Sequence, residues 1–110
     1  MKESEIQRQI WDYLAARQVL AFRMNTGAMK TDNRFLRFGV VGMADLLAFK
    51  ESAYPAHGSG IMLLITPVWL EVKNAKGVQS EYQKSFQKQV ESHGHLYVLA
   101  RSVDDVVEVI

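Results

Sequence analysis

The chain has 110 residues, of which 48% are hydrophobic and 23% are charged, and its formal net charge is +1. This length and composition are those of one globular domain, residues 1–110, and they exclude a disordered chain. The absence of cysteine excludes a disulfide framework and a thiolate zinc site, and the small net charge means that any basic surface for nucleic acid is local.

The sequence holds no pattern typical of a membrane protein or a secreted one. The polar start Met1–Glu5 lacks the apolar stretch of a signal peptide. The apolar run Ile61–Leu70 is too short to span a bilayer and is followed by a charge at Glu71. We therefore expect a cytoplasmic protein without a membrane partner, and the lack of cysteine agrees with a reducing compartment.

The first half of the chain is predicted to form one helix followed by short strands. Ser4 and Gln7 have the spacing of a capping box, and apolar residues then recur at helical spacing, which predicts a helix over 4–17. The segment 25–33 is polar and aperiodic, so we expect a loop there. Strands are expected over 19–24, over 34–38 as a short edge strand, and over 44–49.

The second half is predicted to alternate between strands and helices. Residues 51–60 contain Pro55 and two glycines, which favours a loop, and a strand is expected over 61–73 with a bulge or an open edge at Pro67. Ser80 and Gln83 form a second capping-box pattern, and this helix is expected to end near Gly94. A buried strand over 95–100 and a short helix over 102–109 complete the chain.

A strand, a crossover helix and a further strand imply a parallel pair of strands in one sheet. The sequence therefore predicts the α/β class, with a mixed sheet flanked by helices.

The most informative residues are Glu71-Val72-Lys73, at the end of the apolar run. Side chains alternate along a strand, so Glu71 and Lys73 point to one face while Val72 faces the core. A carboxylate and an amine at the end of a buried strand are costly unless they pair or take part in chemistry. Asp45 stands at the start of another apolar segment, and the two carboxylates can lie side by side if the two strands are neighbours.

Two neighbouring carboxylates and a lysine indicate a site for a hard divalent cation. Mg²⁺ takes oxygen ligands and commonly only one or two carboxylates, so Asp45, Glu71 and the carbonyl of Val72 are the expected metal ligands. Such a cation, Mg²⁺ or Mn²⁺, lowers the pKa of a coordinated water and neutralises charge on a scissile phosphate. Lys73 is placed to orient that water or to stabilise the charge that develops in the transition state.

These residues resemble a nuclease family. Gly42-x-Ala44-Asp45, then Glu71-Val72-Lys73, then Gln83 resemble the VRR-NUC branch of the PD-(D/E)XK nuclease superfamily, and the resemblance covers nearly the whole chain. One departure is Ala44, which stands where the superfamily name has a proline.

The resemblance implies a fold, an activity and a set of site residues. It implies a restriction-endonuclease-like αβββαβ core, a catalytic Lys73 and a metal on Asp45 and Glu71. It adds Glu5 in the first helix and Gln83 in the second to the catalytic residues. It further implies a stand-alone, phage-type, homodimeric endonuclease that cuts branched DNA, such as four-way (Holliday) junctions, with Mg²⁺ or Mn²⁺.

Basic and polar residues near the predicted loop and the second helix suggest contacts to DNA phosphates, which position DNA without reading its sequence. The candidate DNA-binding residues are Arg23, Asn25, Lys30, Arg34, Arg37 and Lys76, with Lys84 and Lys88 as further members of a basic rim.

Each residue also has a structural interpretation. Gln83 can serve only the capping box, Glu5 only the helix dipole, and Asp45 only a turn. The three histidines lack ligand spacing, and Trp11 and Trp69 are expected in the core or in an interface. Two other functions therefore stay open. One is a non-catalytic DNA-binding module that retains the nuclease fold, and the other is a structural subunit in which the acidic pair makes salt bridges with Lys73.

Overall fold

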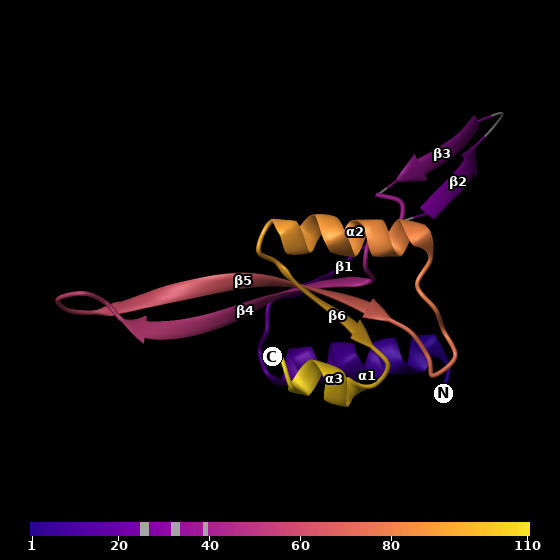
Figure 1. Ribbon diagram of the computed structural model, residues 1–110. Helices are drawn as coiled ribbons and strands as arrows, with labels where there is room; N and C mark the ends of the chain where they lie inside the picture. Colours follow the sequence, from indigo (N-terminus) through magenta and orange to yellow (C-terminus); the bar gives the residue numbers. More distant parts are fainter. Residues whose placement is uncertain (25–26, 32–33, 39) are drawn as a thin grey trace.

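The structure is a computed structural model that describes residues 1–24, 27–31, 34–38 and 40–110. Figure 1 shows the helices and strands in chain order. They are α1 (Glu3–Ala16), β1 (Ala21–Arg23), β2 (Gly27–Thr31), β3 (Arg34–Phe38), β4 (Leu46–Pro55), β5 (Ile61–Val72), α2 (Glu81–Ser92), β6 (Leu96–Ala100) and α3 (Val103–Val107).

Four strands form the central sheet, in the order β1-β4-β5-β6. The pairs β1–β4 and β4–β5 are antiparallel, whereas β5 and β6 are parallel. Helix α2 covers one face of the sheet, while α1 and α3 cover the other (Figure 1). The prediction of an α/β protein with a mixed sheet flanked by helices is thus confirmed, and so is the parallel pair on either side of the crossover helix.

The main core lies between the sheet and the pair α1 and α3. Helix α1 contributes Ile6, Ile10 and Leu14, which recur every four residues and so form one apolar stripe. Their partners from the strands and α3 are Leu46, Ala48, Val68, Leu70, Val72, Ala100 and Val106. Trp11 is half-buried against this cluster.

A smaller core lies under α2. Phe86 and Val90 from the helix pack against the buried Ala44, and Trp69 meets the Phe86 ring edge to face at 4.9 Å between centroids. Both tryptophans are therefore packed against buried side chains, as the sequence suggests. Ala44, the residue at the superfamily's proline position, is fully buried in this cluster.

The two predicted capping boxes have different outcomes. At α2, the Gln83 N–H donates to Ser80 Oγ at 3.1 Å and the Ser80 N–H donates to Gln83 Oε1 at 2.8 Å, which confirms the prediction. At α1, the prediction is wrong: the helix begins at Glu3, its N-cap is Lys2, and no side chain caps it. Ser4 lies inside the first turn, because the N–H groups of Glu5 and Ile6 already bond to the Lys2 carbonyl.

The predicted loop over 25–33 is wrong at residues 27–31, while residues 25, 26, 32 and 33 lie outside the described part of the chain. Residues 27–31 form β2, which pairs antiparallel with β3 from Gly27↔Phe38 to Thr31↔Arg34. These two strands form a separate two-stranded sheet, so β3 is not an edge of the central sheet. Residues 27–31 show no alternation of apolar and polar side chains, so the sequence alone does not reveal a strand that forms by pairing with β3.

The predicted loop over 51–60 is shorter than expected. β4 continues to Pro55, in unbroken register with β5 from Leu46↔Leu70 to Pro55↔Ile61. The turn is left with residues 56–60, where Gly58 and Gly60 adopt positive φ. Pro67 causes no bulge, since it pairs opposite Phe49, and β6 begins to pair only at the next residue, Val68. Pro67 therefore lies where the edge of β5 is open.

The helices of the described ranges are too short or too polar to cross a bilayer.

Gly42 fixes the loop before β4 against the start of α2. Its φ is +84°, and a Cβ added there would lie 2.3 Å from the Tyr82 carbonyl oxygen. Only glycine satisfies both requirements, because L side chains disfavour this conformation and no atom fits between the two backbones. This contact holds the segment that carries Asp45 beside the helix that carries Gln83.

We expect Gly42→Ala to destabilise the protein by about 3 kcal/mol or more, because it adds a backbone clash to the strain of positive φ. Gly58→Ala is the matched control, since Gly58 has φ +98° with no atom within 4 Å. The control is expected to cost only about 1–2 kcal/mol, from φ strain alone. Urea denaturation measures both, and equal losses would contradict the close packing at Gly42.

Candidate metal centre and active site

The two predicted carboxylates meet where β4 begins and β5 ends. The register pairs Leu46 with Leu70, so Asp45 and Glu71, the next residues outward, lie opposite each other on neighbouring strands. The Val72 N–H donates to Asp45 Oδ2 at 2.8 Å. This bond fixes the Asp45 carboxylate against the end of β5. The structure thus brings together Asp45 and Glu71, which stand far apart in the sequence.

The side chain of Val72 faces the core, as strand alternation predicts, while its backbone groups face Asp45. The Val72 side chain is buried in the main core. The Lys73 N–H donates to the Ala100 carbonyl of β6. Because neighbouring residues of a strand direct their backbone groups to opposite edges, the N–H and C=O of Val72 point to the other edge, where the N–H donates to Asp45. The N–H and C=O of one residue in an extended strand point to the same edge. The Val72 carbonyl therefore faces the side of β5 on which Asp45 lies.

Glu71 is a buried carboxylate with one oxygen paired and the other left over. Its Oε2 accepts from Gln83 Nε2 at 3.1 Å and lies 3.7 Å from Lys73 Nζ, and the residue is 2% exposed. Its Oε1 is buried without a hydrogen-bond partner among the described residues. Buried polar atoms in native proteins are nearly always paired, so this oxygen is available to a cation, to water or to the neighbouring Asp45 carboxyl group.

The surroundings of Glu71 disfavour its charged form. Burial, followed by the nearby Asp45 carboxylate, raises the pKa of Glu71 from 4.5 to about 8, although Lys73 lowers it in part. One lysine thus compensates incompletely for two neighbouring carboxylates. An additional positive charge at this place would favour the ionised form of Glu71.

These residues fit a hard divalent cation. The donors are two carboxylates, Asp45 and Glu71, and a backbone carbonyl that faces the same side, an all-oxygen set of the kind that Mg²⁺ and Mn²⁺ prefer. The unpaired Glu71 Oε1 and the raised pKa both indicate a place for positive charge. The residues that are described contain no group of three or more acidic, histidine or cysteine side chains suited to a metal, so water would complete the coordination.

Lys73 lies on the same face as Glu71, as predicted. Its ammonium group is 3.7 Å from Glu71 Oε2, and its side chain is 14% exposed. The stem packs against Gly77, where an added Cβ would be 3.1 Å from Lys73 Cδ. The lysine is therefore held by packing along its stem while its charged end faces the carboxylates.

The first helix places a different glutamate near the site from the one that the resemblance implies. Glu5 is exposed in the first turn of α1. Glu3 Oε1 would lie 3.0 Å from a Cβ on Gly77, next to Lys73, and the charge of Glu3 contributes to raising the pKa of Glu71. The sequence offers no signal for Glu3, because both glutamates stand in the first turn and the predicted helix begins one residue after the observed one.

Arg101 is a second residue that the sequence does not reveal. Its guanidinium donates to the carbonyls of Asn74 and Gly77, at 2.6 and 2.9 Å. Both acceptors belong to the turn that follows Lys73, so Arg101 fixes the loop against which Lys73 packs. Arg101 reaches this turn because β6 pairs with β5. A contact between residues so far apart in the sequence leaves no local pattern from which it could be predicted.

Gln83 makes one contact in the helix cap and another in the candidate site. Its Oε1 completes the capping box of α2, while its Nε2 donates to Glu71. The amide therefore links the start of the helix to the candidate metal ligand.

The candidate DNA-binding residues lie on several different elements. The Arg23 guanidinium lies over the Trp11 ring at 5.5 Å from its centroid, and Lys76 is exposed in the turn after β5. Lys30 belongs to β2, Arg34 and Arg37 belong to β3, and Asn25 falls outside the described residues.

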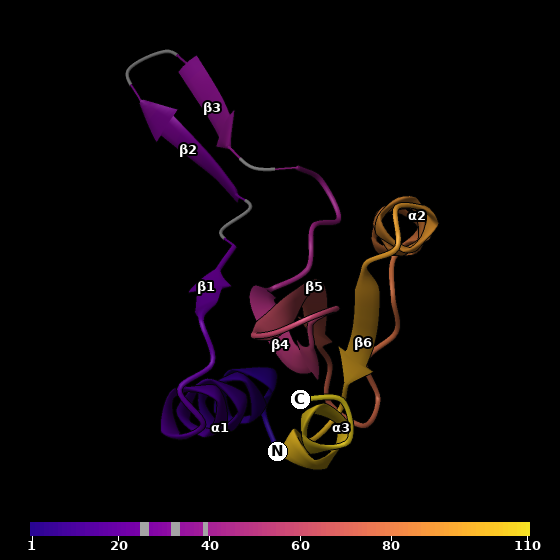
Figure 2. The same cartoon turned by 90° about the vertical axis from the view of Figure 1, so that its left-hand side faces the viewer.

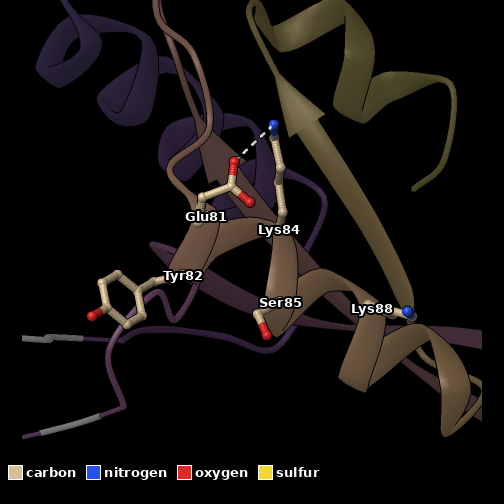
Figure 3. Close-up of a pocket in the computed structure, with 5 residues that line it drawn as sticks. All are labelled: Glu81, Tyr82, Lys84, Ser85 and Lys88. Carbon is tan, nitrogen blue, oxygen red and sulfur yellow. Dashed lines mark hydrogen bonds and ion pairs between the residues drawn. The ribbon is translucent and has the colours of Figure 1, made fainter.

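Lys84 and Lys88 line a shallow depression on the outer face of α2 with Glu81, Tyr82 and Ser85 (Figure 3). Lys84 pairs with Glu81 at 3.5 Å, which weakens its positive field. Gln83 and Phe86 lie on the inner face of the same helix, so this depression opens away from the carboxylates. The two lysines therefore lie apart from the carboxylates that they were expected to surround.

The histidines contribute nothing to the carboxylate site. His95 Nδ1 accepts from Trp69 Nε1 at 2.9 Å, next to the smaller core under α2. His93 is the C-cap residue of α2, and His57 is in the turn between β4 and β5.

We expect the metal-free protein to lose stability as pH rises from about 4.5 to about 8. Over this range the unfolded chain releases the Glu71 proton while the folded chain retains it, because the pKa in the folded state is raised to about 8. Glu71→Gln stays neutral, so its free energy of unfolding should exceed that of the wild type by at least about 1 kcal/mol at pH 8 and match it near pH 4.5.

Urea denaturation in chelator at pH 4.5 and pH 8 measures this difference. Glu91→Gln, on the exposed end of α2, is the control, and it should keep the pH dependence of the wild type because it leaves Glu71 in place. A wild type that gains stability relative to Glu71→Gln between these pH values would contradict the raised pKa.

Comparisons of the chain with protein-family models, with curated proteins and with solved structures find no match. Membership of the nuclease family therefore stays a prediction from the sequence motifs, and the geometry of the carboxylates is the independent support for a function.

Proposed function

We propose that this protein is a Mg²⁺- or Mn²⁺-dependent endodeoxyribonuclease that hydrolyses phosphodiester bonds in branched DNA. The observation that carries the proposal is the buried, unpaired Oε1 of Glu71 beside Asp45, with Lys73 3.7 Å from the other oxygen. Metal-assisted phosphoryl chemistry needs a pair of carboxylates that can bind a cation, together with a neighbouring lysine.

Each residue has a distinct role in this proposal. Asp45, Glu71 and the Val72 carbonyl would hold the cation, which when bound neutralises charge on the phosphate and activates water. Lys73, held by its packed stem, donates a hydrogen bond to the attacking water or to a phosphate oxygen. Gln83 orients the Glu71 carboxylate through the bond at 3.1 Å, and Glu3 adds negative charge beside Lys73.

A purely structural salt bridge agrees less well with the geometry. The Lys73–Glu71 pair leaves Glu71 Oε1 buried and unpaired and places a second carboxylate, Asp45, nearby. A pair kept for stability gains nothing from a second carboxylate, because Asp45 disfavours the ionised form of Glu71 that the salt bridge requires. The arrangement favours chemistry over structure.

The choice of DNA, and of branched DNA in particular, rests on the motif resemblance and on the basic residues near the site. Phosphate contacts from side chains such as Lys76 would position the backbone without reading bases, which suits recognition of DNA shape.

The first test is cleavage of labelled four-way junctions, flaps, single strands and linear duplex with Mg²⁺ or Mn²⁺. We expect junctions to be cut fastest and chelator to abolish cutting. Asp45→Asn and Lys73→Met should each lower the rate by about 100-fold or more. Asparagine can still accept the Val72 N–H, so the fold is retained in the first variant.

Lys50→Met, on β4, and Asp12→Asn, on the exposed face of α1, are the matched controls and should cut at the wild-type rate. A wild type that binds junctions and never cuts any substrate with either metal would replace the nuclease by a DNA-binding module. Full activity in Asp45→Asn would refute the site.

The second test measures metal binding without activity. Millimolar Mn²⁺ should raise the melting temperature of the wild type and shift the Glu71 titration to lower pH, because a bound cation stabilises the carboxylate. Asp45→Asn should abolish both effects, while Asp12→Asn should keep them. Equal stabilisation of all three proteins would show that the cation binds elsewhere.

A further inference from the structure

An open depression lies beside α2, on the face of the sheet that carries the candidate metal centre. Helix α2 lies above β6 rather than above β4, and the segment that enters β4 runs along its open side (Figure 2). A cavity of about 550 Å³ remains between this segment, α2 and β5. We call it the side pocket, and its main lining residues are Val40, Met43, Trp69, Phe86, Gln89 and His95.

The side pocket adjoins the candidate metal centre along two segments of the chain. Met43 precedes Asp45 by two residues, and Trp69 precedes Glu71 by two residues on the same face of β5. A strand rises about 3.3 Å per residue, so Trp69 and Glu71 are about 7 Å apart along β5. Stacked nucleotides rise about 3.4 Å per base, so the side pocket is about two base steps from the metal centre.

The walls of the side pocket suit a flat, uncharged ring. Trp69 lines it and is only half-buried, so part of its indole surface is accessible, while the buried Phe86 ring holds the indole from the side at 4.9 Å between centroids. Within the described residues, no Asp, Glu, Lys or Arg belongs to its lining. Such a wall favours stacking by an aromatic ligand and offers no cation to a phosphate.

Two polar side chains complete the lining. His95 Nδ1 accepts from Trp69 Nε1 at 2.9 Å, so in the neutral ring the proton is on Nε2, which can donate to a ligand. Gln89 is exposed, and its amide can both donate and accept. Nucleobases present carbonyl oxygens, ring nitrogens and amino groups around a flat ring. The lining therefore matches a nucleobase, whereas an aliphatic side chain of a partner protein would use neither polar group.

A base must be unpaired to enter the side pocket. Within a duplex each base is stacked between its neighbours and presents only its edges in the grooves. Extruding a base costs free energy, and this cost is smallest for a base that is already single-stranded. Flaps and opened branch points supply such bases. A site that binds one next to the metal centre would favour cutting beside a branch over cutting within linear duplex.

We propose that the side pocket binds an unpaired nucleobase within about two nucleotides of the scissile phosphate. Stacking on Trp69 and hydrogen bonds to His95 and Gln89 then position the DNA strand at the metal centre. The inference rests on the proposed nuclease function, and it adds to that function the group that selects unpaired DNA.

Fluorescence tests base binding without any cutting. In chelator, a Trp11→Phe protein has Trp69 as its single tryptophan. Single-stranded decathymidylate should quench this fluorescence and bind at least about 10-fold more tightly than an abasic strand of the same length. The abasic strand is the matched control, because it carries the same phosphates without bases. Duplex of the same length should cause little quenching.

Side-chain variants locate the binding site. Gln89→Ala should reduce the preference for the base-bearing strand over the abasic strand by about 5-fold, because a hydrogen bond to the base is lost. Gln9→Ala is the matched control and should keep the preference, since Gln9 is an exposed helical glutamine on α1, which covers the other face of the sheet.

A cleavage assay with Mn²⁺ measures the same contact during catalysis. Removing one base at a time from the unpaired strand of a flap should slow cutting by about 10-fold at a position within about two nucleotides of the cut. In Gln89→Ala the same removal should slow cutting less than in the wild type, because the base has already lost one partner.

Equal quenching by base-bearing and abasic strands, or quenching by neither at hundreds of micromolar, would overturn the proposal. Quenching by an apolar peptide alone would also overturn it and would assign the side pocket to a protein partner. These results differ from failure of the proposed function. A protein that cuts flaps equally fast with and without each base retains the nuclease and loses the base site, whereas one that binds bases and never cuts loses only the nuclease.

Discussion

The antiparallel register between β4 and β5 is the constraint on which the candidate site depends. Leu46 opposite Leu70 brings Asp45 to the end of β5, and the hydrogen bond from the Val72 N–H then holds the Asp45 carboxylate there. A slip by one residue would turn every side chain of one strand to the other face and separate the two carboxylates. The buried apolar residues of both strands prevent that slip, because they would lose the core. The same packing that stabilises the sheet thus positions two acidic groups that repel each other.

The surroundings of Glu71 compensate its negative charge only in part. Burial and Asp45 both raise the pKa of Glu71, and Lys73 compensates in part. Gln83 satisfies one oxygen of Glu71 and the other remains unpaired among the residues that the structure describes. Folding therefore maintains a place where a carboxylate is disfavoured, which costs stability and is typical of sites selected for function. A hydrophobic residue at position 71 would pack at lower cost in the same strand.

The parts of the fold that local patterns determine could be predicted from the sequence. The spacing of Ser80 and Gln83 predicts the start of α2. The alternation of side chains along a strand places Glu71 and Lys73 on one face with Val72 inward. The errors concern features that depend on distant residues. The strand at 27–31 exists through its pairing with β3, β4 extends to Pro55 because β5 continues beside it, and Arg101 reaches the loop after Lys73 through the β5–β6 pair. No window of sequence contains both members of such contacts.

The length of β5 explains why one strand carries two unlike features. Its last residues, from Val68 to Val72, lie between β4 and β6 and under helices, which gives Glu71 the burial that shifts its pKa. Its first residues, from Ile61 to Ile65, have β4 as their one described neighbour and remain exposed. A shorter β5 would support the same carboxylates, because Leu46 and Leu70 pair at the inner end. The outer half of the strand is therefore not needed to position these two carboxylates, and its exposed aliphatic run is a separate feature of the fold.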